Sequence, residues 1–317
     1  MIKKVIISGG REVGGLSAFS NTLAKGFKEI GIEVEVLSFK NLLMRWSDLR
    51  DENILKIYST SAVFLTPFSK NSISVAHGFP RIDAQGYFKT FLIWFSYKLA
   101  EKFSKTVAVS YYVKTHLKAC FNVKVDRVIY NPINSIFLKP EDKNYNRNYL
   151  TYIGRFHEVK NILLFIEPLK EILDKHPKYK AIFIGHGKLY YNLKEKIGND
   201  NRFIIKNAMS QKDLKKILQQ TEVFFSGCET EAFGLTYLEA LSCGAKVVMP
   251  NSGGGLEIAP KLIGKKVFTY SLSQNKDDIY QVINKAIINK SSTNFNIKPF
   301  ISKNIANEYI SLAKGKK

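Results

Sequence analysis

Several features that mark secreted, membrane-spanning or disulfide-bonded proteins are missing from this chain of 317 residues. The N-terminal stretch MIKKVIISGG holds no apolar segment as long as the one that a signal peptide needs. The most apolar stretch, residues 91–95, is far too short to cross a bilayer. The cysteines, Cys120, Cys228 and Cys243, show neither metal-binding nor redox spacing, which suits a reducing cytosol. We therefore expect neither export nor membrane spanning.

Acidic residues are also scarce. The chain has 48 lysines and arginines against 27 aspartates and glutamates, a net charge of +21 that is spread over both halves. Such a field favours anionic partners, which include nucleotides, nucleic acids and the anionic face of a membrane. The basic residues are dispersed and no recognised nucleic-acid-binding module occurs, so we do not expect nucleic acid to be the partner. A basic nucleic-acid-binding protein remains the weaker alternative.

The order of apolar runs predicts two α/β domains. The length is typical of two domains, and 45% hydrophobic residues are enough for two cores. Residues 4–39 read as strand, glycine-rich turn, helix and strand, and a second series of this kind begins at Leu150. The polar run EDKNYNRN, residues 141–148, has no apolar pattern and marks the boundary. We predict two doubly wound, Rossmann-like domains that face a central cleft.

The expected strands are short apolar runs, most of them bounded by glycine, proline or polar residues. In the first half they are residues 4–8, 32–39, 61–65, 72–76, 106–110 and 127–130. In the second half they are residues 150–153, 181–185, 203–205, 223–226 and 246–249. Helices are expected between them, and a final amphipathic helix should span residues 301–312.

Two features of the first half indicate a ligand at the carboxyl ends of strands. Gly14 and Gly15 close the glycine-rich turn, where they let the backbone approach a phosphate at the start of the next helix. The alternative is a tight turn without a ligand. His77 directly follows the strand 72–76, and ligands of open α/β sheets bind outside the carboxyl ends of strands. Its alternative role is that of a buried, hydrogen-bonded structural histidine.

Residues 86–105 are aromatic and basic, and two interpretations fit them. One is an amphipathic helix that lies on anionic lipid. The other is a core helix that packs on the sheet and directs its lysines outward to water. We favour the core helix, because a parallel sheet needs helices to cover its faces.

A loop of the second half carries two cations close to the start of a helix. Arg155 follows the strand 150–153, and Lys160 stands just before a helix that we expect from about Ile162. A forked guanidinium together with a compact ammonium suits a diphosphate. Without an anionic ligand two cations are unfavourable there, because the helix dipole favours anions at this end.

The stretch CETEAFGLTYLEALSCG, residues 228–244, carries the most specific signal. Glu231 lies in a loop before an expected helix and Glu239 lies about two turns inside that helix, with Phe233-Gly234-Leu235 between them. A strand, a tight loop and a helix N-terminus form an anion site, since free backbone N–H groups point at the ligand. Carboxylates beside such a site suit hydroxyl groups, as on a sugar or a ribose. The alternative is a surface helix with two solvated glutamates.

With these motifs in order, the chain resembles the retaining glycosyltransferases of family 4, which have the GT-B fold. Glu231 and Glu239 match the family's E-x7-E motif, and residues 154–161 match its G-R-x4-K-N motif. Further positions fall in the order of the family, namely the Gly14-Gly15 turn, His77, Ser110, Asn131 and the turn at Gly187. Pro132 is a departure, because the family usually has glycine after the asparagine.

The resemblance implies a role for each motif residue. Arg155 and Lys160 would hold the donor diphosphate, Glu239 the ribose hydroxyls and Glu231 the donor sugar. Backbone amides of Phe233, Gly234 and Leu235 would lie near the sugar and the phosphates. Gly14 and Gly15 would approach the diphosphate from the first domain, and His77 would approach the transferred sugar.

The resemblance also implies what each domain binds. It predicts an acceptor-binding domain at residues 1–143 and a nucleotide-sugar-binding domain at residues 148–298. A last helix, at residues 299–317, would cross back to the first domain. The chain is short for the family after its second strand, a region that helps to bind acceptors.

The implied activity is that of a hexosyltransferase, which moves a sugar from a nucleotide-diphosphate-sugar donor to a saccharide acceptor with retention of configuration. A lipid-linked acceptor in bacterial surface polysaccharide synthesis, of lipopolysaccharide or capsule, is expected. No Asp-x-Asp motif occurs, so we expect neither a metal nor another cofactor. The expected location is the cytoplasmic face of the inner membrane, in peripheral contact with anionic lipid. A sugar-nucleotide epimerase or hydrolase on the same fold is the alternative.

Overall fold

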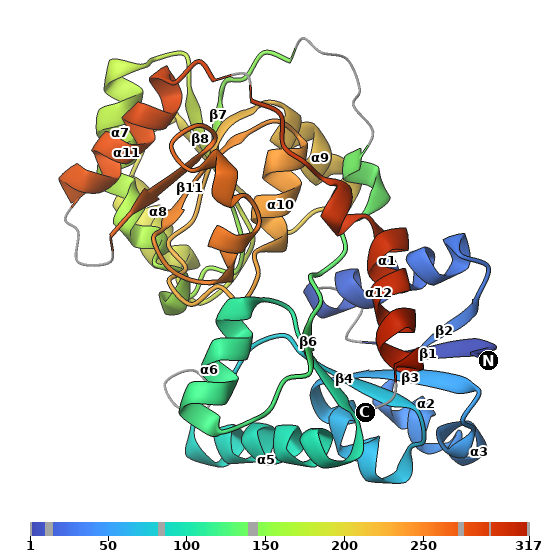
Figure 1. The fold of residues 1–317 in the computed structure, drawn as a ribbon. Helices are drawn as coiled ribbons and strands as arrows, with labels where there is room; N and C mark the ends of the chain where they lie inside the picture. Colours follow the sequence, from blue (N-terminus) through green and yellow to red (C-terminus); the bar gives the residue numbers. More distant parts are fainter. Residues whose placement is uncertain are drawn as a thin grey trace. The chain divides into compact units, whose positions relative to one another are not determined.

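The computed structural model describes residues 2–9, 15–81, 86–138, 145–271, 276–291 and 293–315. By its internal contacts the chain divides into two compact units (Figure 1). The N-terminal unit comprises Met1–Ser135 and Ile297–Lys317, and the C-terminal unit comprises Ile136–Asn296. Each unit is a parallel sheet with helices on both faces, so the prediction of two doubly wound domains is confirmed. How acceptor and donor binding divide between the two units stays a prediction.

The N-terminal unit is built on a six-stranded parallel sheet with the strand order β2-β1-β3-β4-β5-β6. Its strands are β1 (Lys4–Ser8), β2 (Glu33–Leu37), β3 (Ile54–Ser59), β4 (Ser72–Ala76), β5 (Lys105–Ala108) and β6 (Arg127–Val128). Every residue of β3 and β4 is buried. The central strands are mostly apolar along their whole length because helices cover both faces of the sheet.

Most helices of the N-terminal unit belong to one of two groups. On one face, α1 (Gly15–Glu29) and α12 (Ser302–Lys314) pack against each other (Figure 1). The other group consists of α2 (Phe39–Leu43), α3 (Trp46–Arg50), the 3₁₀ helix η1 (Thr60–Phe68) and α5 (Tyr87–Phe103). Helix α6 (Tyr111–Phe121) follows β5. Within the described ranges, no helix combines the length and the apolar character that crossing a bilayer requires.

The C-terminal helix α12 is fixed to the N-terminal unit by close contact with α1. Gly26 of α1 lies against the backbone of Ser302, and a Cβ atom at residue 26 would come 2.2 Å from the Ser302 carbonyl oxygen. Just before α12, Ile301 pairs with Ile133 in a parallel β-bridge. These contacts make the last segment of the chain part of the N-terminal unit, although most of the C-terminal unit precedes it in the sequence.

The prediction of a strand at residues 61–65 is wrong, because these residues belong to the 3₁₀ helix η1. The strand at this place is β3, whose sequence ILKIYS contains the fully buried Lys56. The Lys56 ammonium donates hydrogen bonds to the carbonyl oxygens of Asp51, Ile54 and Lys70, at 2.5, 3.0 and 2.6 Å. Burial lowers the pKa of Lys56 to about 8. A lysine inside a buried strand interrupts the apolar run by which such strands are recognised.

The interpretation of residues 86–105 as a core helix is wrong for one side of that helix. Helix α5 does pack on the sheet, where Tyr97 and Ala100 are buried. Its other side exposes Tyr87, Phe88 and Phe91 to solvent. The number of aromatic residues indicated a core helix, but their angular positions around the helix axis direct many of them to water.

The C-terminal unit also has six parallel strands, in the order β12-β11-β10-β7-β8-β9. They are β7 (Tyr149–Ile153), β8 (Lys180–Ile184), β9 (Phe203–Lys206), β10 (Thr221–Phe225), β11 (Lys246–Pro250) and β12 (Val267–Tyr270). The chain enters the middle of the sheet with β7, proceeds to one edge at β9, and returns to the other side of β7 with β10. The strand order therefore changes direction between β7 and β10.

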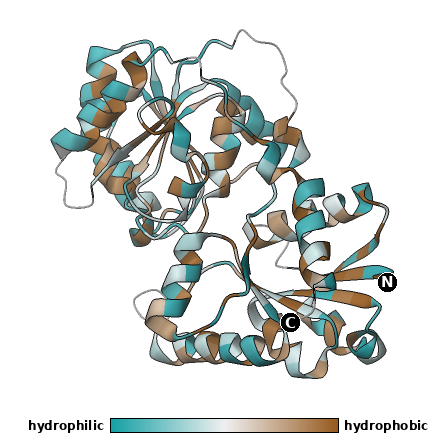
Figure 2. Ribbon diagram, viewed as in Figure 1, coloured by the Kyte–Doolittle hydropathy of each residue, from teal (hydrophilic) through white to brown (hydrophobic). Residues whose placement is uncertain are grey.

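Helices cover both faces of this second sheet (Figure 1). One face carries α7 (Ile166–Lys175), α8 (Tyr190–Ile197) and α11 (Lys276–Ile288), and the other carries α9 (Gln211–Gln219) and α10 (Leu235–Ser242). Figure 2 shows hydrophobic and hydrophilic residues side by side along α7 and α11. This distribution is typical of helices that bury one face and expose the other.

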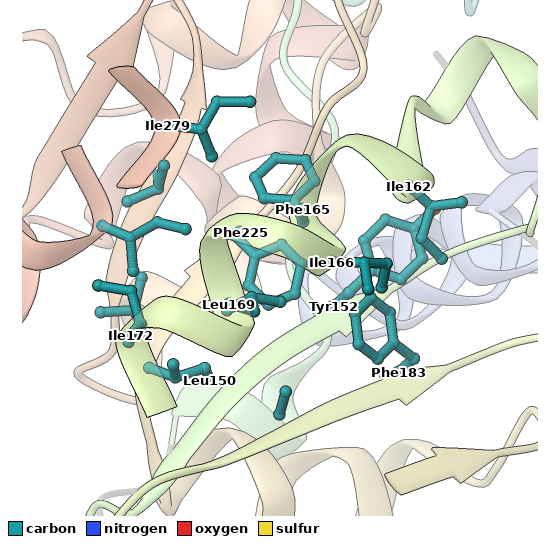
Figure 3. Packing of buried hydrophobic residues seen from close by; sticks show 14 of the residues in the cluster. Leu150, Tyr152, Ile162, Phe165, Ile166, Leu169, Ile172, Phe183, Phe225 and Ile279 are labelled. Atoms are coloured by element: carbon teal, nitrogen blue, oxygen red, sulfur yellow. The ribbon is translucent and has the colours of Figure 1, made fainter. Parts of the chain in front are cut away.

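An aromatic cluster beside α7 holds the carboxyl ends of β7 and β10 (Figure 3). The ring of Phe165 lies 4.7 Å from that of Phe225, the last residue of β10. Tyr152 of β7 lies 6.2 Å from Phe225 and 6.1 Å from Phe183, between ring centroids. Burial of a side chain of this size contributes roughly 1.5–3 kcal/mol. The cluster therefore fixes the two strand ends from which the loops of the candidate site start.

The contact between Gly26 and Ser302 leads to a prediction about stability. At an open helical position, replacing glycine by alanine stabilises a protein by up to ~1 kcal/mol. For Gly26→Ala we expect the opposite, because the added methyl group meets backbone atoms of Ser302. The free energy of unfolding should fall by roughly 1–3 kcal/mol, as measured by chemical denaturation. Gly15→Ala, in the same helix, is the matched control, because a Cβ atom at Gly15 would meet no atom of the described residues within 4 Å. Equal stability of Gly26→Ala and wild type would contradict the close contact.

Candidate functional site

The loops that follow β7 and β10 meet at one edge of the C-terminal sheet. In doubly wound folds ligands bind outside the carboxyl ends of the strands, at the point where the strand order reverses. The Asn161 side-chain amide joins the two loops, because it donates a hydrogen bond to the carbonyl oxygen of Gly227 at 3.0 Å. A Cβ atom at Gly227 would come 2.8 Å from the Lys160 carbonyl oxygen. The packing at this edge therefore requires glycine at residue 227.

Lys160 and Glu231 form an ion pair at this edge. The Lys160 ammonium lies 2.8 Å from a Glu231 carboxylate oxygen and 3.3 Å from the Cys228 sulfur. Both charged side chains are largely buried, with 23% of each exposed. Burial by itself lowers the pKa of Lys160, but the charge of Glu231 and the contact with Cys228 outweigh it and raise the pKa. Both residues are therefore charged at neutral pH.

The carboxylate of Glu231 is held by more than its lysine partner. Burial by itself would raise its pKa, but the charge and hydrogen bond of Lys160 lower it, helped by hydrogen bonds from Cys228 and from the backbone N–H of Phe233. On the backbone side, Gly254 donates its N–H to the Glu231 carbonyl oxygen at 2.8 Å. A Cβ atom at Gly253, whose φ is +84°, would come 2.9 Å from the same oxygen. The glycine turn after β11 therefore supports the loop that carries Glu231.

Helix α10 begins at this edge with an uncapped N-terminus. Gly234 is its N-cap residue, with φ 92° and ψ 59°, and neither a side-chain cap nor an acidic residue occupies the first turn. A Cβ atom at Gly234 would come 2.5 Å from the ring of Tyr237. Phe233 is buried, and Leu235 is the first residue of the helix. The free N–H groups and the dipole at this end suit an anion.

Glu239 lies one turn further along α10 and differs from Glu231 in its surroundings. Its exposed fraction is 8%, and its carboxylate makes no hydrogen bond or ion pair with the residues that the structure describes. Burial raises its pKa to about 8, so the protonated form predominates at neutral pH. A buried carboxylate without a partner is unfavourable for folding and is typical of a functional site.

Arg155 has an exposed side chain that is not engaged with the described part of the protein. Its backbone carbonyl oxygen accepts a hydrogen bond from the Tyr152 hydroxyl at 2.9 Å, which fixes the loop at this residue. Burial raises the pKa of Tyr152, and the charges of Cys228 and Glu231 add to this effect. The positive charges of Lys160 and Arg155 lower the pKa of the same hydroxyl group. Both cations are thus close enough to act on the same hydroxyl group.

The site residues expected in the first half of the chain lie in the N-terminal unit. Gly15 is the first residue of α1, and Gly14 lies outside the described residues. His77 follows β4 and is half-buried, with its Nε2 atom 3.1 Å from the Ser59 hydroxyl and its ring 4.5 Å from that of Phe19. Burial lowers the pKa of His77 to about 4, so the ring is neutral near pH 7. Contact of His77 and Gly15 with a donor stays a prediction.

The C-terminal unit thus brings together Lys160, Glu231, Phe233 and Gly234, with Arg155 and Glu239 on the elements that flank them. Sequence reasoning placed Asn161 in the G-R-x4-K-N motif but missed the supporting roles of Tyr152, Gly227, Cys228, Gly253 and Gly254. Glycines in the loops after strands were an available signal for Gly227, Gly253 and Gly254. In the described part of the chain, no group of His, Cys, Asp and Glu side chains could hold a metal ion; independence of metals stays a prediction.

The raised pKa of Glu239 leads to a prediction about stability and pH. The folded protein keeps this proton up to about pH 8, whereas the unfolded chain loses it near the ordinary value of 4.5. Between these values the folded state binds more protons, so the free energy of unfolding should fall as the pH rises, by up to about 1.4 kcal/mol per unit. Glu239→Gln should flatten this dependence between pH 5.5 and 8 in chemical denaturation. Glu195→Gln, at an exposed glutamate of α8, is the control. A Glu239→Gln curve parallel to wild type would contradict the assignment.

Solved structures with the same fold cover nearly the whole chain. The structure is similar to that of HepE from Anabaena in complex with UDP and glucose, with a TM-score of 0.71 and 16% identity over 99% of this chain and 95% of that one. A glycosyltransferase from Rickettsia africae gives a TM-score of 0.70 and 19% identity over 98% and 97%. At these identities the likeness shows the fold alone, and it confirms the predicted fold class, that of the GT-B glycosyltransferases.

Relatives of known name match only part of their own length. One subunit of human phosphatidylinositol N-acetylglucosaminyltransferase is 28% identical over 161 residues, which are 49% of this chain and 33% of that protein. An uncharacterized glycosyltransferase of Methanocaldococcus jannaschii is 28% identical over 172 residues, which are 49% of this chain and 44% of that protein. The match therefore spans less than half the length of either relative.

The family model described as glycosyl transferases group 1 matches residues 135–296, just over half of the chain. The matched range corresponds to the C-terminal unit and contains both loops of the candidate site together with helix α10. The chain belongs to the glycosyl transferases group 1 family.

Proposed function

We propose that this protein is a retaining glycosyltransferase of family 4, which moves a sugar from a nucleotide-diphosphate-sugar donor to a saccharide acceptor. One observation carries the proposal: a cationic loop and an uncapped helix N-terminus meet at one edge of the C-terminal unit, and the helix that begins there carries a buried carboxyl group with no partner among the described residues. The first two features suit a diphosphate, and the third suits the hydroxyl groups of a ribose. A nucleotide sugar carries both kinds of group in one molecule.

The names of similar proteins support the choice of donor and acceptor. UDP sugars are the first donors to test, because the HepE structure contains UDP and glucose and that of the pneumococcal O-GlcNAc transferase GtfA contains UDP and GlcNAc. A lipid-linked acceptor is supported by the human relative, whose name describes N-acetylglucosamine transfer to phosphatidylinositol. A place in bacterial surface polysaccharide synthesis, of lipopolysaccharide or capsule, rests on composition alone.

In this proposal the cationic groups stabilise the leaving diphosphate. Breaking the bond between sugar and diphosphate builds negative charge on the leaving group and positive charge on the sugar ring. Arg155 and the N–H groups at the start of α10 face the negative charge, where fixed donors are most effective. Lys160 has three N–H donors, of which two are directed at Glu231 and Cys228, so one remains for a phosphate oxygen.

The configuration of the transferred sugar is retained if the acceptor attacks on the same face of the sugar from which the diphosphate leaves. The leaving phosphate then takes the proton of the acceptor hydroxyl, and no protein base is needed at that step. Glu231 and Glu239 recognise hydroxyl groups in this scheme and are not the acid and nucleophile of a glycoside hydrolase. This fits their states, because Glu231 is already paired with Lys160 and Glu239 is buried within a helix.

The diphosphate role of Arg155 is tested by thermal shifts with a panel of nucleoside diphosphates and nucleotide sugars. One nucleotide should raise the melting temperature of the wild type, and Arg155→Ala should lose most of that shift. With the stabilising donor, turnover of Arg155→Ala should fall by at least roughly a hundredfold, because a charge-assisted contact to the leaving group is lost.

Lys180→Ala is the matched control, since it removes an exposed cation of the same unit at the amino end of β8. It should keep the thermal shift and the turnover of wild type. Wild-type turnover in Arg155→Ala would refute the diphosphate role. Free sugar released without an acceptor would indicate a hydrolase, and an isomerised donor would indicate an epimerase.

The ribose role of Glu239 predicts proton release on donor binding. Near pH 7 the carboxyl group is protonated because burial raises its pKa to about 8. Hydroxyl donors favour the ionised form, so up to one proton should leave for each nucleotide bound. Calorimetric titrations in phosphate and in Tris should therefore give different apparent enthalpies. In Glu239→Gln this difference should vanish and affinity should fall roughly tenfold to a hundredfold. Unchanged proton release in Glu239→Gln would exclude the role.

A further inference from the structure

Helix α5 of the N-terminal unit exposes large aromatic side chains and buries mostly small or polar ones. The exposed fractions are 80% for Tyr87, 76% for Phe88, 54% for Phe91 and 41% for Phe95. The residues of α5 that are buried are Thr90, Ser96, Tyr97 and Ala100. A helix that serves only to cover a sheet has the reverse distribution, because its apolar side faces the core. The sequence of α5 therefore favours a second apolar contact on its outer side.

The exposed aromatic residues lie on one side of the helix. At about 100° per residue, Tyr87, Phe91, Phe95 and Phe88 fall within an arc of roughly 100°. We refer to these four residues as the α5 face. Figure 1 shows α5 at the border of the N-terminal unit, with its long axis along the surface. The four side chains thus form an apolar strip along one side of the N-terminal half of the helix.

Two rings of this strip, those of Phe91 and Phe95, are held by each other and by neighbouring aromatic residues. Phe91 stacks on Phe95 with centroids 6.2 Å apart, and Phe64 of η1 lies 6.5 Å from Phe95. Trp94 lies 5.6 Å from Phe91, and its ring nitrogen donates a hydrogen bond to the Phe121 carbonyl oxygen. An ordered apolar surface of this kind on a folded protein marks an interaction site.

Positive charge borders the α5 face. The helix carries Lys89, Lys98 and Lys102 against the single acidic residue Glu101. Lys98 and Lys102 fall within the arc of the aromatic residues toward the C-terminal end of the helix, whereas Lys89 lies outside it. The Lys98 ammonium is paired with Glu101 at 2.7 Å, and the Lys102 ammonium lies over the ring of Phe103. Exposed aromatic rings beside lysines, on a helix parallel to the surface, suit an anionic lipid layer, where rings enter the headgroup region and lysines meet phosphates.

We propose that the α5 face docks the N-terminal unit on an anionic lipid surface. The inference stands beside the proposed function and does not rest on it, because lipid binding is measured without donor or acceptor. The other occupant that an apolar strip fits is a second copy of this chain, but pairing two such faces would bring like charges together. The excess of lysine on α5 therefore favours lipid.

Vesicle flotation tests the apolar part of the proposal. Wild type should float with vesicles of phosphatidylcholine and phosphatidylglycerol, and much less with phosphatidylcholine alone. The double variant Phe88→Ser/Phe91→Ser should partition at least roughly tenfold less, because two rings are lost from the contact. Tyr191→Ser/Ile288→Ser is the matched control, since both residues are exposed on helices of the C-terminal unit. It should bind as wild type does.

The charge part is tested by Lys98→Glu/Lys102→Glu, which changes the two lysines within the arc of the aromatic residues. This variant should lose roughly fivefold in binding to anionic vesicles for each lysine and should show no preference over neutral ones. Lys180→Glu/Lys212→Glu, with the same change of charge in the C-terminal unit, is its control. The tryptophans are Trp46 and Trp94, so Trp46→Phe leaves Trp94 as a reporter whose emission should shift to the blue on vesicle binding.

Three outcomes would overturn the proposal. One is the absence of wild-type binding to anionic vesicles. Another is equal binding by wild type and Phe88→Ser/Phe91→Ser, with both proteins folded by circular dichroism. The third is a wild-type dimer in sedimentation velocity that dissociates in the aromatic variant while vesicle binding is unchanged, which would assign the α5 face to a second copy. Donor-induced thermal shifts in the same variants separate this result from failure of the proposed function.

Discussion

The parallel pairing of β7 with β10 is the constraint on which the candidate site depends. Leu150 pairs with Val223 in this register, and the hydroxyl groups of Thr151 and Thr221 lie 2.7 Å apart. Because both strands run in the same direction, their carboxyl ends open at one edge of the sheet. The chain after β7 leads to helices on one face and the chain after β10 to a helix on the other, so the two loops diverge there. Residues that are 71 positions apart in the sequence, Lys160 and Glu231, thereby meet.

The loop before α10 and the helix itself carry two glutamates in opposite protonation states. Glu231 keeps its charge because a lysine, a cysteine and a backbone amide compensate its burial. Glu239 is also buried but has no such partners among the described residues, so burial alone raises its pKa to about 8. The difference comes from position, since Glu231 lies in a loop beside the cationic segment and Glu239 lies inside α10. Glu231 therefore joins the two loops without a ligand, whereas Glu239 would be compensated in the proposed role, in which ribose hydroxyl groups donate hydrogen bonds to it.

The sequence predicted most of the fold because parallel strands covered on both faces are continuous apolar runs. The prediction failed at β3, where Lys56 is buried although lysine is ordinarily exposed. The Lys56 ammonium donates hydrogen bonds to three carbonyl groups that come near it only in the folded chain. The motif residues of the candidate site were predicted from their spacing. The ion pair of Lys160 with Glu231 was not found, because contacts between distant loops depend on strand order, which local patterns do not contain. The exposed aromatic residues of α5 were predicted to lie in the core, because their number was considered without their angular positions around the helix axis.

The groups that surround the excess positive charge differ between the two units. In the C-terminal unit, Arg155 and Lys160 stand beside a helix N-terminus, so an anion there is attracted by side chains and dipole together. In the N-terminal unit, the lysines of α5 border aromatic rings that water solvates poorly. Exposed rings and an excess of like charge both lower the stability of the isolated protein. Replacing either by neutral polar residues would relieve that cost without disturbing the buried side of α5. In the proposed docking on anionic lipid, contact with the lipid would offset this loss of stability, which gives a physical reason for both features to occur on one helix.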